Sequence, residues 1–254
     1  MIAEANFRNN DINGFLEELG EAQDKEKFFK EYVKSVQLND QKVNSVISLY
    51  SNQEILKEYY AGVDKEFHGV PILLKDNIDS IGIANTAGSL AFKNNLPKND
   101  APLVGKLRES GFIILGKANL SEWANFRGNP STSGWTSING QTNNPFNLKY
   151  NPCGSSSGSA AAIAQGLVPV SIGTETNGSI TCPASVNGVV GIKPTVGLVS
   201  RTGVIPISET QDTAGPMAKN VMDAAKVLKA IAGRDLLDSY TAKIPQDYDY
   251  EELT

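Results

Sequence analysis

One lysine and two serines carry the chemistry that this sequence can perform. Lys75 follows an apolar run at residues 70–74. Ser155 lies in a segment rich in serine and glycine, and Ser179 follows Gly178. A serine hydroxyl is a weak nucleophile and needs a base within hydrogen-bond reach. A buried lysine can be that base, because burial disfavours the charged ammonium and lowers its pKa. We therefore predict that Lys75 takes a proton from Ser155, which takes one from the nucleophile Ser179.

The single histidine, His68, is the other candidate for the base. It stands directly before the apolar run, and no neighbouring carboxylate pattern would orient its ring. We therefore interpret His68 as a structural residue at the entrance of a strand. For Lys75 the alternative is a lysine whose ammonium reaches solvent from a strand end. The two serine segments favour its catalytic interpretation.

The residues before Ser179 have the composition of a loop that gathers backbone donors. Gly178 can adopt a positive φ, and Asn177 is among the few other residues that tolerate one. Consecutive N–H groups in such a loop can converge on one point and stabilise the oxyanion of a tetrahedral intermediate. The predicted donors are the backbone N–H groups of Thr176, Asn177, Gly178 and Ser179. The alternative, which these residues leave open, is a tight turn between a strand and a helix.

The segment at residues 154–159 also has the composition of an anion-binding loop. Serine and glycine before a helix can cradle phosphate. The segment lacks the Gly-Lys-Ser/Thr ending of a P-loop and the Gly-x-Gly-x-x-Gly spacing of a dinucleotide site. The sequence therefore predicts no nucleotide cofactor, and it contains no ligand cluster that predicts a metal.

Cys153 and Cys182 are the only cysteines. Two cysteines are too few for a disulfide framework, and their spacing does not fit a zinc site. We interpret them as two small buried thiols that pack well. The alternative is a redox-sensitive thiol at the active site, since each lies two or three residues from a key serine.

Composition excludes several partners. The chain has 254 residues, is 40% hydrophobic and carries a net charge of −5, so no basic surface would recruit nucleic acid or anionic lipid. No apolar run approaches the roughly 18 residues that cross a membrane. The first 13 residues are polar and lack the apolar stretch of a signal peptide. These features predict a cytoplasmic protein, or a secreted or periplasmic one if a leader was removed.

Apolar periodicity predicts alternating helices and short, nearly all-apolar strands. Asp100 and Asn220 are the expected N-caps of two of the helices. The second of these has Val221, Ala224, Val227, Leu228 and Ile231 facing inward. Helices are expected around residues 27–36, 101–109, 157–165 and 221–231, and strands at 43–49, 70–74, 112–115, 167–172 and 189–192. This pattern predicts an α/β fold with a mixed, largely central sheet covered by helices on both faces.

The motifs, and their order along the chain, resemble those of the amidase signature family. The resemblance covers roughly residues 10 to 235. The segments that carry the resemblance are residues 75–77, 116–122, 154–160, 178–180, 188–195 and 212–218. The resemblance implies that Ser179 is the acyl-enzyme nucleophile, Ser155 the bridging serine and Lys75 the base. It also implies a cis peptide bond between Gly154 and Ser155. The expected substrate is a carboxylic amide or a peptide C-terminal amide, which is hydrolysed to acid and ammonia without a cofactor.

Three segments look most like bacterial peptide amidases, which remove ammonia from C-terminal peptide amides. They are residues 121–127, 133–135 and 173–179. The alternative is the amidase subunit of a glutamyl-tRNA amidotransferase, which more usually has Asp at position 175 and Gly at position 177. A further alternative is an inactive fragment or pseudoenzyme, which the intact serine and lysine positions disfavour.

Two departures from the family pattern stand out. Thr181 occupies a position where many members have Arg, and members are usually about twice as long. We expect a single domain over residues 1–254, with N-terminal helices at 1–65, the signature core at 66–235 and a polar tail at 236–254. The expected partners are the amide substrate and either a missing C-terminal half or further copies of the chain.

Overall fold

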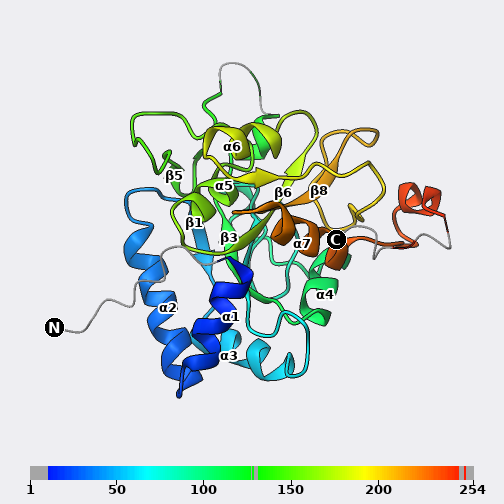
Figure 1. The fold of residues 1–254 in the computed structure, drawn as a ribbon. Coiled ribbons are helices and arrows are strands. Elements are labelled where there is room, and N and C mark those ends of the chain that lie inside the picture. Colours follow the sequence, from blue (N-terminus) through cyan, green and yellow to red (C-terminus); the bar gives the residue numbers. More distant parts are fainter. Residues whose placement is uncertain (1–10, 127, 129–130, 246–248, 250–254) are drawn as a thin grey trace.

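A six-stranded sheet forms the centre of the computed structural model, which describes residues 11–126, 128, 131–245 and 249 (Figure 1). The strand order is β1-β3-β2-β6-β8-β7. The strands are β1 (Val46–Leu49), β2 (Pro71–Lys75), β3 (Ile113–Ala118), β6 (Val170–Glu175), β7 (Val190–Gly191) and β8 (Thr213–Ala218). A separate two-stranded hairpin is formed by β4 (Trp135–Thr136) and β5 (Gly140–Gln141).

Strand directions make the sheet mixed, as the sequence predicted. β2 runs parallel to both of its neighbours, β3 and β6. β1 pairs antiparallel with β3, and β8 pairs antiparallel with β6 and β7. Because β2 and β6 are parallel, Lys75 and Glu175 leave the sheet at the same edge. That edge positions the candidate site.

Helices cover both faces of this sheet. α5 (Ser157–Ala164) lies against β2, β3, β6 and β8, whereas α4 (Pro102–Glu109) and α7 (Val221–Ile231) pack on each other and on the sheet from the opposite face (Figure 1). Apart from Ile163, α5 consists of small residues, which permits close packing. A Cβ on Gly158 would lie 2.3 Å from the Ser45 carbonyl oxygen, so only glycine fits there. The short helix α6 (Thr181–Val186) begins two residues after Ser179, with Ile180 as its N-cap.

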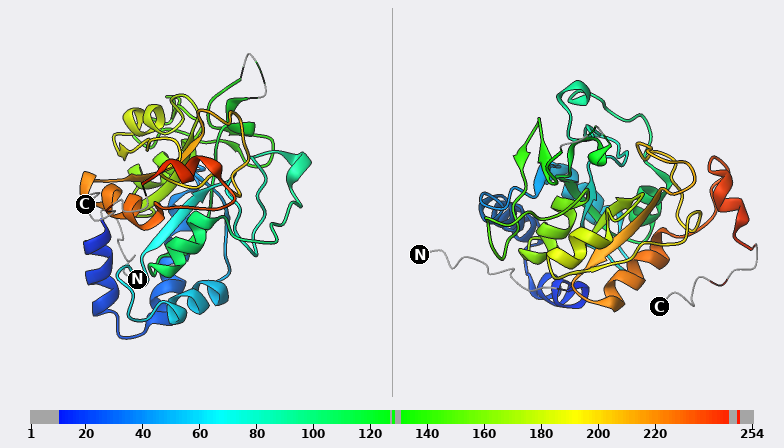
Figure 2. Two further views of the ribbon diagram at one scale, coloured as in Figure 1. Left: turned by 90° about the vertical axis from the view of Figure 1, so that its right-hand side faces the viewer. Right: turned by 90° about the horizontal axis from the view of Figure 1, so that it is seen from above.

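Three helices, α1 (Ile12–Glu21), α2 (Lys25–Asn39) and α3 (Asn52–Ala61), gather at one end of the molecule (Figure 2). α2 buries the apolar face that its periodicity predicted, including Phe29 and Val36. The Tyr32 hydroxyl donates to the Leu167 carbonyl oxygen at 2.6 Å. The Ile12 N–H donates to Asp223 of α7 at 2.9 Å. These buried hydrogen bonds attach the N-terminal helices to the sheet layer.

Two predictions about the first residues of helices are wrong. Ala101, not Asp100, is the N-cap of α4, and it caps without a side-chain hydrogen bond. The Asp100 carboxylate instead accepts from the Ile81 N–H and pairs with Arg108, because an ion pair is available to it. Val221, expected to face the core, is 67% exposed because it stands in the first turn of α7.

Two strands also differ from expectation. A strand was expected at residues 189–192, but β7 is shorter, and within the described residues it pairs with β8 alone and forms one edge of the sheet. β8 was not predicted, because Gly215 and Pro216 argue against a strand. In the structure, both residues contact Ile192 on the neighbouring segment. The Ile192 N–H donates to the Pro216 carbonyl, and a Cβ on Gly215 would lie 2.1 Å from the Ile192 oxygen.

Candidate active site

Lys75 is the last residue of β2, and its side chain is fully buried. Its Nζ donates to Ser155 Oγ at 2.6 Å. It also donates to two atoms of Thr174 on the neighbouring strand, Oγ1 at 2.8 Å and the carbonyl oxygen at 3.1 Å. Three acceptors therefore fix the amine, and one of them is the serine hydroxyl that the sequence predicted as its partner.

The environment of Lys75 favours a neutral amine near physiological pH. Burial lowers the pKa of Lys75 to about 7, although the negative charges of Glu175 and Asp212 act in the opposite direction. A base with a pKa near the working pH can both accept and return a proton. Lys75 therefore has the protonation behaviour that the predicted relay needs.

Ser155 lies in a loop whose shape depends on its neighbours. The Gly154–Ser155 peptide bond is cis, as the resemblance implied. The Ser155 carbonyl accepts from the Ser121 N–H at 3.0 Å. A Cβ on Gly154 would lie 2.3 Å from Ser121 Oγ, so glycine is required at this close approach. Ser155 itself is fully buried, with its hydroxyl on the Lys75 amine.

Ser179 lies beside the Ser155 loop. Gly178 before it has φ +79°, the positive value that the sequence predicted. The Ser156 N–H donates to the Ser179 carbonyl oxygen at 3.1 Å, which joins the two serine loops through the backbone. Ser179 is 9% exposed, whereas Lys75 and Ser155 are inaccessible. No hydrogen bond joins the Ser155 and Ser179 hydroxyls in the described part of the chain.

One of the four predicted oxyanion donors, the Gly178 N–H, is already bound to a side chain of the protein. The Gly178 N–H donates to Glu175 Oε1 at 2.8 Å, so it points at a carboxylate and not at a substrate position. The physical reason is that Glu175 ends β6 and its side chain turns back under the loop. The N–H groups of Thr176, Asn177 and Ser179 stay as predicted donors.

Three polar side chains at this edge were not assigned a role from the sequence. Thr174 binds the Lys75 amine, and Asn77 Nδ2 donates to Thr174 Oγ1 at 3.0 Å. Glu175 binds the nucleophile loop. Their positions in the sequence could have indicated a role. Each stands at or just after the carboxyl end of a buried strand, where sites in parallel sheets form.

The interpretation of the two cysteines as free thiols is wrong. Cys153 and Cys182 form a disulfide, with their Cα atoms 6.0 Å apart. Two distant segments meet here, because the sheet brings the loop before Ser155 next to α6. A sequence separation of 29 residues does not reveal that meeting.

His68 has structural contacts, as expected. Its Nε2 lies 2.8 Å from the Tyr59 carbonyl oxygen, and its ring stacks on Tyr59. Among the described residues, no group of three or more His, Cys, Asp or Glu side chains is arranged to hold a metal. Within the same residues, the structure contains no helix with the length and hydropathy of a membrane span. Arg127, part of one family-like segment, lies outside the described residues, as does part of the polar tail.

Comparison with known proteins agrees with the resemblance seen in the motifs. The family described as Amidase matches residues 28–254. A probable amidase of Arabidopsis thaliana is 55% identical over 175 residues, which are 68% of this chain and 34% of that protein. A glutamyl-tRNA(Gln) amidotransferase subunit of Methanosarcina mazei is 43% identical over 191 residues, 73% of this chain and 39% of that protein.

Among solved structures, the peptide amidase of Stenotrophomonas maltophilia superposes with a TM-score of 0.89 at 49% identity. The match covers 95% of this chain and 52% of that one. The chain thus spans about half, or less, of the length of the relatives that it matches. On the family match and these similarities, the chain belongs to the amidase signature family.

Proposed function

We propose that the protein of which this chain is a part, or the whole, hydrolyses carboxylic or peptide C-terminal amides through an acyl-enzyme on Ser179. One observation carries the proposal: the buried Lys75 amine, with a pKa of about 7, lies 2.6 Å from Ser155 Oγ. A neutral amine at this distance can accept the Ser155 proton. The backbone hydrogen bond between Ser156 and Ser179 supports Ser179 as the next group in the relay.

Acylation follows from this order. Ser179 Oγ attacks the amide carbonyl carbon while its proton passes to Ser155 Oγ and the Ser155 proton passes to Lys75 Nζ. The carbonyl π electrons move to oxygen, where backbone N–H groups of residues 176, 177 and 179 would stabilise the negative charge. When the C–N bond breaks, the Lys75 proton returns through Ser155 to the leaving nitrogen, and ammonia departs.

Deacylation uses the same relay with water. Water attacks the ester carbonyl carbon, its proton passes through Ser155 to Lys75, and the proton then returns through Ser155 to Ser179 Oγ as the C–O bond breaks. The net reaction converts an amide and water to a carboxylic acid and ammonia. Each catalytic group ends in its starting protonation state.

The similarity to a peptide amidase over 95% of the chain supports a peptide C-terminal amide as the substrate. The second candidate function is the amidase subunit of a glutamyl-tRNA amidotransferase, supported by the Methanosarcina mazei relative. Residues 175 and 177 favour the first, since they are Glu and Asn where the subunit more usually has Asp and Gly. Ammonia release from an amidated dipeptide, compared with release from glutamine, separates the two functions.

The experiment that tests the proposal is labelling by a fluorophosphonate, which reacts with activated serines. We expect one adduct, located on Ser179 by mass spectrometry, and none after Ser179→Ala. An adduct on Ser155 would contradict the proposed order of the relay. Ammonia release from the amidated dipeptide should be lost in the same variant.

We also propose an oxidising compartment for this protein. Disulfides persist in secreted and periplasmic proteins and are rare in the cytosol. The Cys153–Cys182 disulfide therefore favours the secreted or periplasmic alternative over the cytoplasmic expectation. Thiol alkylation of protein taken directly from each cell fraction would test this, and two free thiols in the native protein would contradict it.

A further inference from the structure

The loop that carries Ser179 is held by a carboxylate. Glu175 Oε1 accepts from the Gly178 N–H at 2.8 Å. Glu175 Oε2 accepts from the Ile180 N–H at 2.7 Å, the Thr181 N–H at 2.9 Å and the Thr181 hydroxyl at 3.2 Å. The two oxygens thus bind N–H groups on both sides of Ser179. Thr181 is the position at which many family members have Arg, and here its hydroxyl adds to the same cluster.

A second carboxylate holds the start of the loop. The Thr176 hydroxyl donates to Asp212 Oδ1 at 2.5 Å. Asp212 is itself fixed, because its Oδ2 accepts from the N–H groups of Ile207 and Ser208 at 2.7 and 2.9 Å. The loop is therefore anchored before and after the nucleophile by side chains from two different segments.

Packing does not hold the middle of this loop. A Cβ built on Gly178 would meet no atom within 4 Å, and Asn177 is exposed. Glu175, by contrast, is 5% exposed. Burial alone would raise the pKa of Glu175, but three backbone N–H groups and the Thr181 hydroxyl outweigh it and lower the pKa. Glu175 is therefore an anion whose hydrogen bonds set the path of residues 178–181.

We propose that Glu175 and Asp212 are positioning residues that fix the nucleophile loop and carry negative charge at the end of the sheet where Lys75 lies. This inference rests on the proposed function for its kinetic consequence, whereas the anchoring of the loop is a separate physical claim. The two carboxylates oppose the effect of burial on the pKa of Lys75. They would thus fix the position of Ser179 and raise the pH at which Lys75 becomes a base above the value that burial alone would give.

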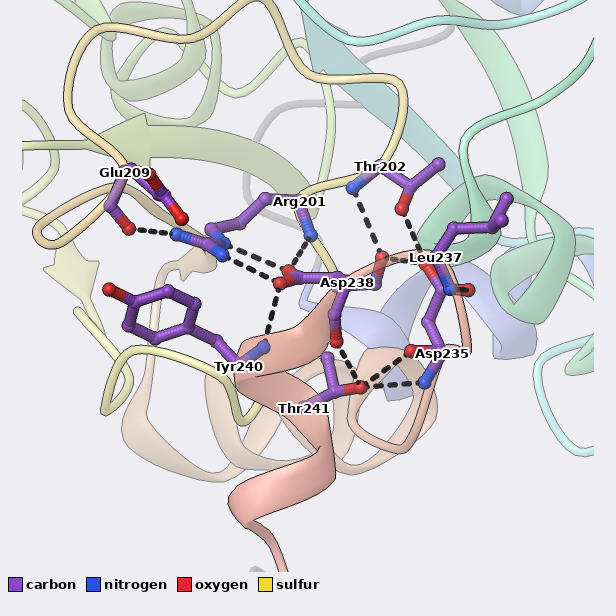
Figure 3. A network of polar contacts seen from close by, with 9 residues as sticks. Arg201, Thr202, Glu209, Asp235, Leu237, Asp238, Tyr240 and Thr241 are labelled. Carbon is purple, nitrogen blue, oxygen red and sulfur yellow. Dashed lines mark hydrogen bonds and ion pairs between the residues drawn. The ribbon is translucent and has the colours of Figure 1, made fainter.

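Two cations near this end of the sheet, Arg201 and Lys117, each have a carboxylate partner. Arg201 lines the same small cavity as Glu175 and Asp212. Its guanidinium is bound instead by both oxygens of Asp238, at 2.6 and 2.8 Å, and lies over the Tyr240 ring (Figure 3).

On the other neighbouring strand, Lys117 lies 3.8 Å from Asp76, and both are fully buried. That pair joins β3 to the end of β2, and burial opposes both charges, since it lowers the pKa of Lys117 and raises the pKa of Asp76. Among the described residues, Glu175 and Asp212 are the charged groups that act on Lys75, and Asp212 also attracts the Arg201 guanidinium.

Amide hydrogen exchange in the full chain tests the anchoring without any assay of activity. In Glu175→Gln one acceptor oxygen becomes an NH2 group, so at least one of the amides of Gly178, Ile180 and Thr181 loses its partner. We expect exchange at these amides to rise about tenfold or more. Glu209→Gln is the matched control, because it removes an exposed negative charge from the segment before β8. Exchange unchanged from the parent in Glu175→Gln would overturn the anchoring role.

Kinetics test the charge effect. In Glu175→Gln and in Asp212→Asn, kcat/KM should fall about 10- to 100-fold, because misplacement of a reacting group by about an ångström costs that much. The rising limb of the pH profile should also move to lower pH, since Lys75 loses an anion that favours its charged form. Glu209→Gln should change neither. A limb in the same place as in the parent would overturn the charge effect.

Different results would contradict this inference and the proposed function. If the parent fails to react with fluorophosphonate at Ser179, the proposed function is wrong, and the exchange experiment still decides the anchoring. If Glu175→Gln does not fold, Thr181→Val removes only the hydroxyl bond to Glu175 on an exposed residue. That variant should raise exchange at Ile180 and Thr181 about two- to threefold, and no rise there would contradict the inference.

Discussion

A disulfide between Cys153 and Cys182 links the loop that precedes Ser155 to the helix that follows Ser179. Both half-cystines are partly exposed, so a reductant can reach them. The bridge is a covalent counterpart of the hydrogen bond between the Ser156 N–H and the Ser179 carbonyl. The loops that carry Ser155 and Ser179 are thus joined by a disulfide and by a backbone hydrogen bond.

Removal of the disulfide should destabilise the protein. In Cys153→Ser/Cys182→Ser, we expect the free energy of unfolding to fall by about 2–4 kcal/mol, because the unfolded chain gains freedom. Denaturant unfolding with and without a phosphine reductant measures the effect. The parent should lose stability in reductant and the double variant should not, and equal sensitivity of the two proteins would contradict the prediction.

Substitution of the relay residues should give graded losses. Ser179→Ala should abolish acyl-enzyme formation, whereas Ser155→Ala and Lys75→Ala should slow it by about 10²- to 10⁴-fold or more. His68→Gln is the control, because His68 contacts Tyr59 and not the serines. Stopped-flow or quenched labelling with fluorophosphonate gives the rates. A larger loss for His68→Gln than for Lys75→Ala would reverse the assignment of the base.

The pH dependence should follow Lys75. Burial lowers its pKa to about 7, against an opposing effect of Glu175 and Asp212. The base must be neutral, so kcat/KM should rise as pH increases through about 7 and level off in mildly alkaline solution. Initial rates of ammonia release between pH 5 and about 9 test this through one ionisation. A rate that falls across this range would be inconsistent with a lysine base.

Thr174 should affect the reaction by orienting the Lys75 amine. Thr174→Val removes the hydroxyl that accepts from Lys75 Nζ at 2.8 Å and from Asn77 at 3.0 Å. The amine then has fewer acceptors to orient it, and we expect kcat to fall about tenfold with little change in KM. Thr174→Ser keeps the hydroxyl and should recover most of the rate. A loss confined to KM would instead indicate contact with substrate.

The length of the relatives leads to a prediction about association. The chain matches about half of the Stenotrophomonas maltophilia peptide amidase, β7 leaves an open sheet edge, and Phe146, Tyr150 and Val186 are exposed. Exposed edges and apolar surface favour self-association. We expect residues 1–254 alone to be oligomeric or poorly soluble and weakly active. Light scattering and ammonia release should both change when the segment corresponding to the relatives' C-terminal half is supplied. A monodisperse, fully active monomer of residues 1–254 would disprove this.

The sequence by itself predicted the mixed sheet, the buried β2 strand and the apolar face with which α2 packs on the core. These follow from local patterns, because apolar periodicity and glycine positions depend on near neighbours along the chain. The residues also predicted the pairing of Lys75 with Ser155, and the resemblance to the family implied the cis bond before that serine. The order of the motifs is a property of the chain, and the resemblance gave them their meaning.

Tertiary structure alone decided the contacts between segments that are distant in sequence. The Thr176 hydroxyl binds Asp212, Thr174 binds the Lys75 amine, and Cys153 meets Cys182. None of these can be read from spacing, because each depends on how β2, β6, β8 and α6 converge at one edge of the sheet. The strand β8 was missed for a related reason. Gly215 and Pro216 disfavour a strand in isolation, and only the close approach of Ile192 makes them suitable there.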